Sequence, residues 1–190
     1  MPSTASTVNC SSLCDALWDN ITVTQHARFV LEDCKGALAE LRDGVQGPEW
    51  RRRFAAAVAL LRAVGHVLKN VDSAVSPEAK AAIEAEWQAL NSTKPDPKDP
   101  YTCTCYAHIF WSFIEKERNN ILKEYRFNAG QSVTVPIPSG VTTYSYPMNS
   151  GPLAGPDQRE VIRKAIQFWE DYLDRVDERI ADCLDPERRR

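Results

Sequence analysis

The apolar residues between 54 and 71 cover almost the whole circumference of the helix that they predict. At about 100° per residue, Phe54, Leu61 and Leu68 lie on one stripe, other apolar residues widen it, and alanines occupy much of the opposite side. A helix that is apolar on nearly all sides is expected at the centre of a fold, covered by several neighbours. Arg62 and His66 lie one turn apart within this pattern, so each is expected to need a polar partner.

Apolar residues at three- and four-residue spacing predict four further helices. Thr24 is expected to cap the first helix of the chain, and Ser76 followed by Pro77 marks the start of the third. Asp157 and Glu160 have the spacing of a capping box at the start of the last helix. With the central helix included, the expected helices cover about 24–44, 48–71, 76–93, 106–125 and 157–184.

The segment 126–156 differs from the rest of the chain because it contains four glycines and five prolines. Alternating apolar residues on both sides of Pro138-Ser139-Gly140 predict a short β-hairpin that turns there, and Pro136 would confine its first strand to an edge. An ordered excursion of this length is more often functional than a simple linker. The expected fold is therefore all-α: a five-helix bundle with a loop and β-hairpin insertion before the last helix.

The 190 residues suffice for one domain with a proper core. We expect a single helical domain over 24–185, preceded by a flexible arm (1–23) and followed by a basic tail (186–190). The net charge of −3 excludes a global field that would draw the protein to nucleic acid or to a membrane. No run approaches the roughly 20 apolar residues of a membrane helix, and no secretory signal is recognisable, so a cytoplasmic location with reduced cysteines is expected.

Two cysteine pairs raise the question of a zinc site. Cys103 and Cys105 are separated by one residue, whereas structural zinc ligands usually occur twice as pairs two to four residues apart. Cys10 and Cys14 lie in the arm that we expect to be flexible. The sequence also lacks a glycine-rich phosphate loop, a nucleophile elbow and a His-Glu-x-x-His motif. We therefore expect neither a metal nor a cofactor.

Arg118 is the polar residue whose position in the pattern is hardest to reconcile with a simple core. On a continuous α-helix it falls in the middle of an apolar stripe, within about 60° of Trp111, Ile114, Ile121, Leu122 and Tyr125. Because arginine keeps its charge in proteins, it needs a carboxylate, carbonyl groups or an anionic ligand. Two interpretations remain open: a salt bridge at the rim of the core, or an arginine presented to a groove that binds an anion or a phosphodiester.

Arg118 and Asn119, on a late helix of an all-α bundle, resemble the motif of the HEPN superfamily. Its signature is an arginine, often followed by Asn, His or Asp, with a histidine several residues later. The resemblance implies a homodimer whose motif helices meet at a shared cleft and, in many members, a metal-independent ribonuclease. Other members act in toxin–antitoxin, defence and RNA-processing systems, or only bind. The stretch Ile-Glu-Lys-Glu-Arg-Asn-Asn also resembles uncharacterised bacterial proteins of unknown function.

The chain departs from this signature where the histidine is expected, because Lys123, Glu124 and Tyr125 occupy those positions. Lysine and tyrosine are poor bases near neutral pH, although Lys123 can bind phosphate. His66 could replace the missing histidine in space, since its helix must contact the fourth helix. The alternative for His66 is a neutral core histidine bonded to a carbonyl or carboxylate. The candidate catalytic residues are Arg118, Asn119 and His66, and the candidate binding residues are Arg62, Lys123 and Tyr125.

Three functions follow as hypotheses. The first is a HEPN-like, RNA-related protein, either a degenerate metal-independent ribonuclease or an RNA-binding protein, in a bacterial defence or toxin–antitoxin context. The second is a non-catalytic module for dimerisation or for binding a protein partner. The third is a helical bundle that binds a small anion through Arg118. A homodimer, RNA and a protein partner are therefore the expected partners, and a membrane is not.

Overall fold

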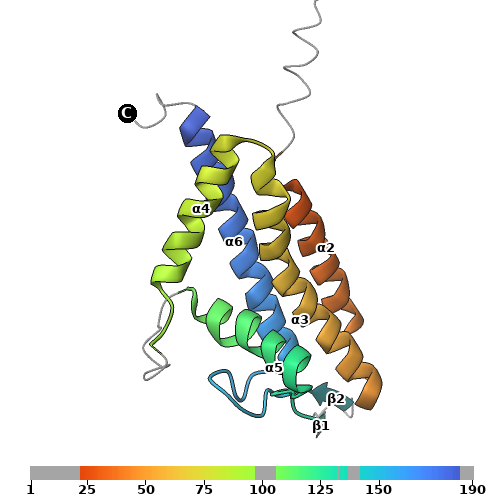
Figure 1. Ribbon diagram of the computed structural model, residues 1–190. Coiled ribbons are helices and arrows are strands. Elements are labelled where there is room, and N and C mark those ends of the chain that lie inside the picture. Colours follow the sequence, from red (N-terminus) through yellow and green to blue (C-terminus); the bar gives the residue numbers. More distant parts are fainter. Residues whose placement is uncertain (1–21, 97–105, 132, 137–141, 185–190) are drawn as a thin grey trace, which may run out of the picture.

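The computed structural model describes residues 22–96, 106–131, 133–136 and 142–184, and these form a mostly helical fold with five helices (Figure 1). The first helices are α2 (Gln25–Glu40), α3 (Gly47–Asn70) and α4 (Pro77–Ser92), with a single 3₁₀ turn, η1 (Asp72–Ala74), after α3. A π-helical segment, η2 (Phe110–Glu115), continues directly into α5 (Lys116–Glu124), and α6 (Gln158–Leu184) ends the described chain. The all-α class and the five expected helices are confirmed.

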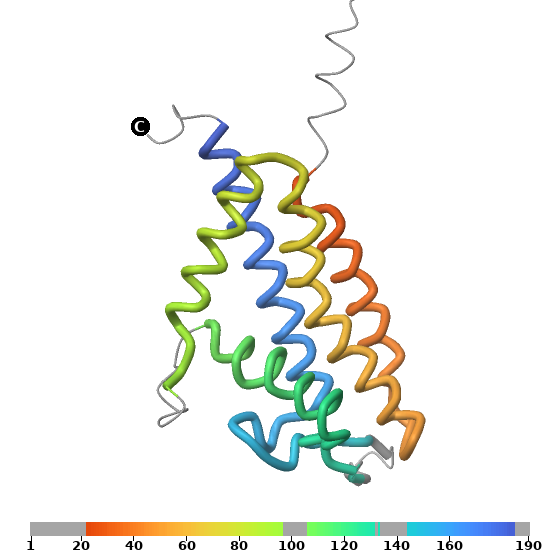
Figure 2. Tube along the Cα trace, viewed as in Figure 1, coloured from red at the N-terminus to blue at the C-terminus, as the bar shows by residue number. Residues whose placement is uncertain are grey.

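The long helices α2, α3 and α6 run side by side along the molecule, α4 lies beside α6, and α5 crosses their lower end (Figures 1 and 2). Helix α3 contacts α2, α4, α5 and α6, as expected of a central helix. Its coverage is less complete than the alanine-rich pattern predicted, because Ala56, His66 and Lys69 are exposed. The buried side of α3 consists of Trp50, Phe54, Ala57, Val58, Leu61, Val64, Gly65 and Leu68.

Within the described residues, one segment is long and apolar enough to cross a membrane by length and composition alone. It is Gly47–Ala74, which has a mean hydropathy of 1.4 in its most apolar window, of which 39% is buried inside the fold. The same segment contains α3, whose buried face packs against four other helices. The core helix of a soluble protein meets the same criterion of length and composition.

The start of α2 is stabilised differently from the prediction. Thr24 forms no capping hydrogen bond; its hydroxyl instead donates to Asp177 of α6 over 2.7 Å. The buried carboxylate of Asp72, in η1, accepts the backbone N–H of Ala27 at 2.9 Å and that of His26 at 3.3 Å. A residue remote in sequence therefore satisfies the free N–H groups of this helix end. Periodicity near Thr24 cannot reveal such a cap.

The predicted N-terminal caps of α4 and α6 are present in the structure. The Ser76 hydroxyl accepts the N–H of Ala79 at 3.1 Å, which confirms the predicted cap of α4. Asp157 caps α6 by accepting the N–H of Arg159 at 2.9 Å. The predicted capping box is not closed, because the Glu160 side chain pairs with Arg163 of its own helix.

The π-helical segment changes which residues of α5 face the core. A π-turn adds one residue to a helix. The core-facing residues after the turn therefore do not continue the spacing of the core-facing residues before it. The buried residues after the turn include Glu117, Asn120 and Ile121, whereas Leu122 and Tyr125 are 58% and 69% exposed. The predicted apolar stripe centred on Arg118 was therefore wrong in phase: Glu117, not Arg118, is the buried charged residue of this helix.

Glu117 connects α5 to the segment that follows it. Its carboxylate oxygens accept the backbone N–H of Asn128 at 2.9 Å and the side-chain amide of Asn128 at 2.8 Å. Burial raises the pKa of Glu117 above its ordinary value, and the hydrogen bonds from Asn128 partly offset that effect. The first residues of the insertion are in this way held against the core.

The insertion contains the expected hairpin. Strand β1 (Val133–Pro136) pairs antiparallel with β2 (Thr142–Ser145), in a register that places Val133 opposite Ser145 and Pro136 opposite Thr142. The predicted turn at 138–140 lies outside the described residues. Figure 1 shows the insertion at the lower end of the bundle, below the start of α3 and beside α5.

Candidate functional site

A chain of polar contacts links α3 to the junction of η2 and α5. The Arg62 Nε atom donates to a carboxylate oxygen of Glu115 at 2.8 Å. The other Glu115 oxygen accepts the side-chain amide of Asn119 at 3.2 Å, and the Asn119 amide oxygen accepts Nη1 of Arg118 at 2.9 Å. Three of the candidate residues are thus joined through a carboxylate that the sequence analysis had not assigned to the site. We call Arg62, His66, Glu115, Arg118 and Asn119 the α3–α5 cluster.

Arg118 is half-buried, and its charge is not neutralised by a carboxylate of the described residues. Its hydrogen-bond partner in that part of the chain is the neutral amide of Asn119. The rim salt bridge that had been one interpretation for Arg118 is formed by Arg62 with Glu115 instead. A guanidinium held by an amide oxygen keeps other N–H groups for a ligand, and it has a fork geometry that suits phosphate.

His66 completes the α3–α5 cluster one turn beyond Arg62 on α3. Its side chain is exposed and forms no hydrogen bond with any described residue, so the interpretation as a bonded core histidine is wrong. Partial burial lowers the pKa of His66, and the positive charges of Arg62 and Arg118 lower it further, against the opposing effect of Glu115. The imidazole is therefore mostly neutral at pH 7 and can accept a proton.

The remaining two candidates lie outside the α3–α5 cluster. Lys123 is exposed and sits about 140° round the helix from Arg118, which places it on a different face. Tyr125 ends α5 in the left-handed conformation, with a φ of 50°. Its ring packs edge-on against Phe127 at 5.4 Å, and the Arg51 guanidinium lies 5.8 Å from its centre. Hydrogen bonds and an ion pair thus join three of the six predicted site residues, and His66 lies one turn from Arg62 on α3. Lys123 and Tyr125 lie apart from them.

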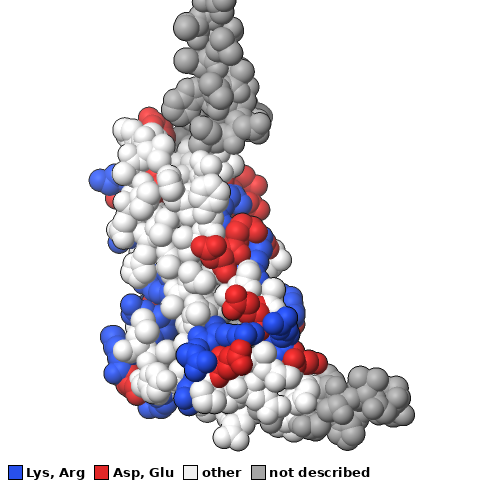
Figure 3. Space-filling model, turned by 90° about the vertical axis from the view of Figure 1, so that its right-hand side faces the viewer, with Lys and Arg blue, Asp and Glu red and all other residues white. Residues whose placement is uncertain are grey.

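Charged side chains of both signs occur on the face of the molecule that Figure 3 shows. On the face of the molecule seen in Figure 3, acidic and basic side chains are interspersed over the lower half and much of the upper half is uncharged. No broad basic surface is visible on that face. Because the net charge is −3, binding of a polyanion at the α3–α5 cluster would depend on a few specific phosphate contacts rather than on a large positive field.

The titration of His66 provides a direct check on the electrostatics of the α3–α5 cluster. We expect an NMR titration to give His66 a pKa below 6.5. Arg62→Gln should raise that pKa because it removes a positive neighbour and leaves Glu115 unpaired. Lys80→Gln, an exposed change on α4, should leave it unaltered. A His66 pKa at or above the ordinary value in the unaltered protein would contradict this description.

The cysteines and metal ligands add no further site within the described ranges. No group of three or more His, Cys, Asp or Glu side chains there could hold a metal ion. Cys34 is buried, and burial raises the pKa of its thiol to about 12, which makes it unreactive. The pairs Cys10 and Cys14, and Cys103 and Cys105, lie outside the described residues.

The structure also contains a pocket that the sequence analysis missed. It lies between the start of α3 and the insertion and has a volume of about 540 Å³. The sequence signal was indirect: Trp50 falls near the start of the expected helix 48–71, and Tyr146 falls in the segment 126–156. Nothing in their spacing shows that the two rings meet, which they do at 3.3 Å between centres.

Comparisons with protein-family models, with curated proteins and with solved structures gave no match to this chain.

Proposed function

We propose that this protein is a HEPN-like helical protein that binds RNA at the α3–α5 cluster and cleaves it without a metal ion. The observation that carries the proposal is the chain of contacts from Arg62 through Glu115 and Asn119 to Arg118, with His66 one turn beyond Arg62 on α3. In this proposal His66, from α3, takes the place of the missing motif histidine. The resemblance of Arg118-Asn119 to the HEPN motif supports the RNA substrate and a role in bacterial defence or in a toxin–antitoxin pair.

The chemistry requires a base and a group that stabilises negative charge. Neutral His66 would remove the proton of a ribose 2′-hydroxyl, and the 2′-oxygen would attack the adjacent phosphorus. The bond from phosphorus to the 5′-oxygen of the next nucleotide breaks, and that oxygen takes a proton from the imidazolium or from water. Arg118 would stabilise the charge on the phosphate oxygens in the transition state. The products are a 2′,3′-cyclic phosphate and a 5′-hydroxyl.

The other members of the α3–α5 cluster hold these two groups in place. Asn119 accepts from Arg118 and donates to Glu115, which orients the guanidinium. Glu115 in turn fixes Arg62, so that α3 and α5 keep their relative position. We assign Asn119, Glu115 and Arg62 as positioning residues. Lys123 and Tyr125, being on other parts of the surface, are left as outer contacts to a longer RNA.

The test is incubation of the purified protein with mixed single-stranded RNA and transfer RNA in the presence of a chelator. We expect cleavage that is insensitive to EDTA and fragments that end in a 2′,3′-cyclic phosphate. Cleavage that stops with EDTA, or fragments with a 3′-hydroxyl, would contradict the mechanism. Absence of cleavage by fresh protein at several RNA concentrations would overturn the catalytic proposal.

A second candidate function is a non-catalytic interaction module, most simply a homodimer. The observation that favours it is the exposure of two large side chains, Leu122 on α5 and Tyr125 directly after that helix. Large exposed apolar side chains are common at protein interfaces. A defined dimer by light scattering, disrupted by Leu122→Glu and accompanied by no RNA turnover, would favour this function over the first.

A further inference from the structure

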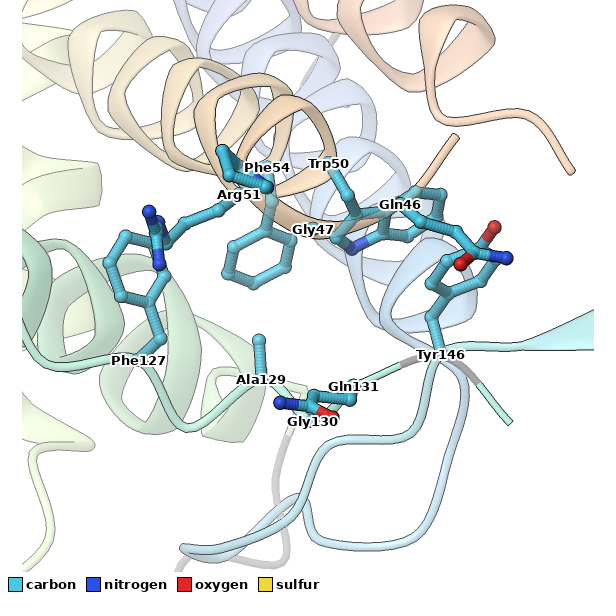
Figure 4. Close-up of a pocket in the computed structure, with 11 residues that line it drawn as sticks. Gln46, Gly47, Trp50, Arg51, Phe54, Phe127, Ala129, Gly130, Gln131 and Tyr146 are labelled. Atoms are coloured by element: carbon cyan, nitrogen blue, oxygen red, sulfur yellow. The ribbon is translucent and has the colours of Figure 1, made fainter. Parts of the chain in front are cut away.

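The pocket at the start of α3 is built from two parts of the chain that are distant in sequence. Figure 4 shows Phe54 pointing into the space from above, Phe127 and Arg51 on one side, and Trp50 and Tyr146 on the other. Ala129, Gly130 and Gln131 of the insertion form its floor. A volume of about 540 Å³ lies within the range of pockets that hold a small organic ligand.

The aromatic wall on the side of Trp50 is rigid. The rings of Trp50 and Tyr146 are stacked, with 4° between their planes. The indole N–H donates to Gln158 at 2.7 Å, and the Tyr146 hydroxyl donates to the Val45 carbonyl at 2.8 Å. The amide of Gln158 donates to the carbonyls of Gly130 and Pro147, both at 3.1 Å. These bonds fix the wall and the floor to each other before any ligand arrives.

The guanidinium of Arg159 adds a further constraint on the stacked pair. It lies 5.0 Å from the centre of the Tyr146 ring and 5.9 Å from that of Trp50. Ion pairs with Asp157 and Asp43 hold this guanidinium in place. The two rings are therefore positioned by contacts from outside the pocket. A ligand that packs beside them would not have to order this wall, which lowers the cost of binding.

The charge in the pocket has one sign. Among the described lining residues Arg51 is charged and no acid occurs, and Arg51 forms no ion pair with the described part of the chain. The pocket also borders the N-terminus of α3, a helix of 24 residues. Gln46 gives that end no side-chain cap, and the acid of the first turn, Glu49, does not line the pocket.

We propose that this pocket binds a planar aromatic anion of about the size of a nucleoside monophosphate. The ring system packs against Phe54 and Phe127, where aromatic surface is available on two sides. The anionic group, a phosphate or a carboxylate, lies near Arg51, on the side of the pocket formed by Phe127. The side-chain amides of Gln46 and Gln131 supply hydrogen bonds to polar atoms of the ligand. None of these residues belongs to the α3–α5 cluster, so the proposal stands apart from the proposed function.

Isothermal titration with four probes tests this proposal: AMP, adenosine, inorganic phosphate and indole-3-acetate. We expect AMP, indole-3-acetate or both to bind, and adenosine and phosphate to bind at least about tenfold more weakly, because each lacks half of the recognised chemistry. Binding of AMP alone identifies a nucleotide ligand, and binding of indole-3-acetate alone identifies an aromatic carboxylate. No binding of either anion up to about 10 mM would overturn the proposal.

Three variants locate the binding in the pocket. Arg51→Gln should weaken binding about tenfold by removing the charge-assisted contact. Arg52→Gln changes the neighbouring exposed arginine, which does not line the pocket, and should leave the affinity within about twofold. Ala129→Leu extends a side chain that points into the space, and should abolish binding while Arg51 is intact. Binding that survives both Arg51→Gln and Ala129→Leu would show that the ligand occupies another site.

Discussion

Replacing Arg118 by alanine is expected to lower kcat/KM for RNA cleavage by about 10²–10³, the usual loss when one charge-stabilising donor is removed from a transition state. The loss is expected in kcat because the guanidinium contributes most when negative charge develops on the phosphate. Folding should be little affected, since Arg118 is half-buried and bonds only to Asn119 among the described residues. Steady-state kinetics on a short single-stranded RNA measure the effect.

Lys123→Ala is the matched control for Arg118→Ala. It removes a positive charge from the same helix, but from an exposed position on a different face. Its kcat/KM is expected to stay within about threefold of the unaltered protein, mainly through weaker general attraction of RNA. If Lys123→Ala were as damaging as Arg118→Ala, the charge of α5 as a whole would matter and the specific role of Arg118 would be wrong.

Replacing Gly65 by alanine is expected to lower the free energy of unfolding by about 1–2 kcal/mol, even though alanine is the better helix former. A Cβ atom at this position would lie 2.8 Å from Cη2 and 3.2 Å from Cζ2 of Trp169. The Trp169 ring is fully buried and packed edge-on against Phe110 and Tyr172, so it has little freedom to move aside. Urea unfolding followed by circular dichroism measures the loss.

Gly36→Ala provides the same substitution in a helix where space is free. A Cβ atom at Gly36, in α2, would meet nothing within 4 Å. Stability should therefore rise by about 0.4–1 kcal/mol, because alanine reduces the conformational freedom of the unfolded chain. Equal effects of the two substitutions would show that the contact between α3 and the Trp169 ring is not as close as described here.

Hydrophobic periodicity predicted the helices well because most of them present a single apolar face to one core. On α6, the predicted stripe from Ile162 to Ile180 is buried, and only its last member, Leu184, is exposed. Ser76 and Asp157 cap the helices that they were expected to cap, since both act on N–H groups a few residues away. The sequence therefore predicted the structure correctly where the stabilising interaction joins residues that are close together in the chain.

The errors arise where a distant residue or an irregular turn intervenes. The π-turn over Phe110–Glu115 changes which residues of α5 face the core. A prediction from periodicity treats the helix as continuous and therefore misses this change. For the same reason Glu117 was missed as the buried acid. Asp72 caps α2 in place of Thr24 because η1 folds back beside that helix end, a contact that only the three-dimensional arrangement creates.

The candidate site, too, was predicted in one part and missed in another. The contact between α3 and the fourth helix was expected, and it joins Arg62 of α3 to Glu115 and, through Asn119, to Arg118. The bridging role of Glu115 was not foreseen, because it depends on the phase of the helix after the π-turn. The pocket beside Trp50 was not foreseen either, since its floor consists of loop residues whose path has no periodic signal.

The central claim is that His66 and Arg118 act together on one phosphate, and a double-mutant cycle tests it most directly. The cleavage rate with EDTA is measured for the unaltered protein, His66→Ala, Arg118→Ala and the double variant. If the two residues serve one step, each single change should cost at least about 100-fold, and the double variant should be scarcely worse than either. Retention of full activity by His66→Ala, or losses that simply multiply, would contradict the claim.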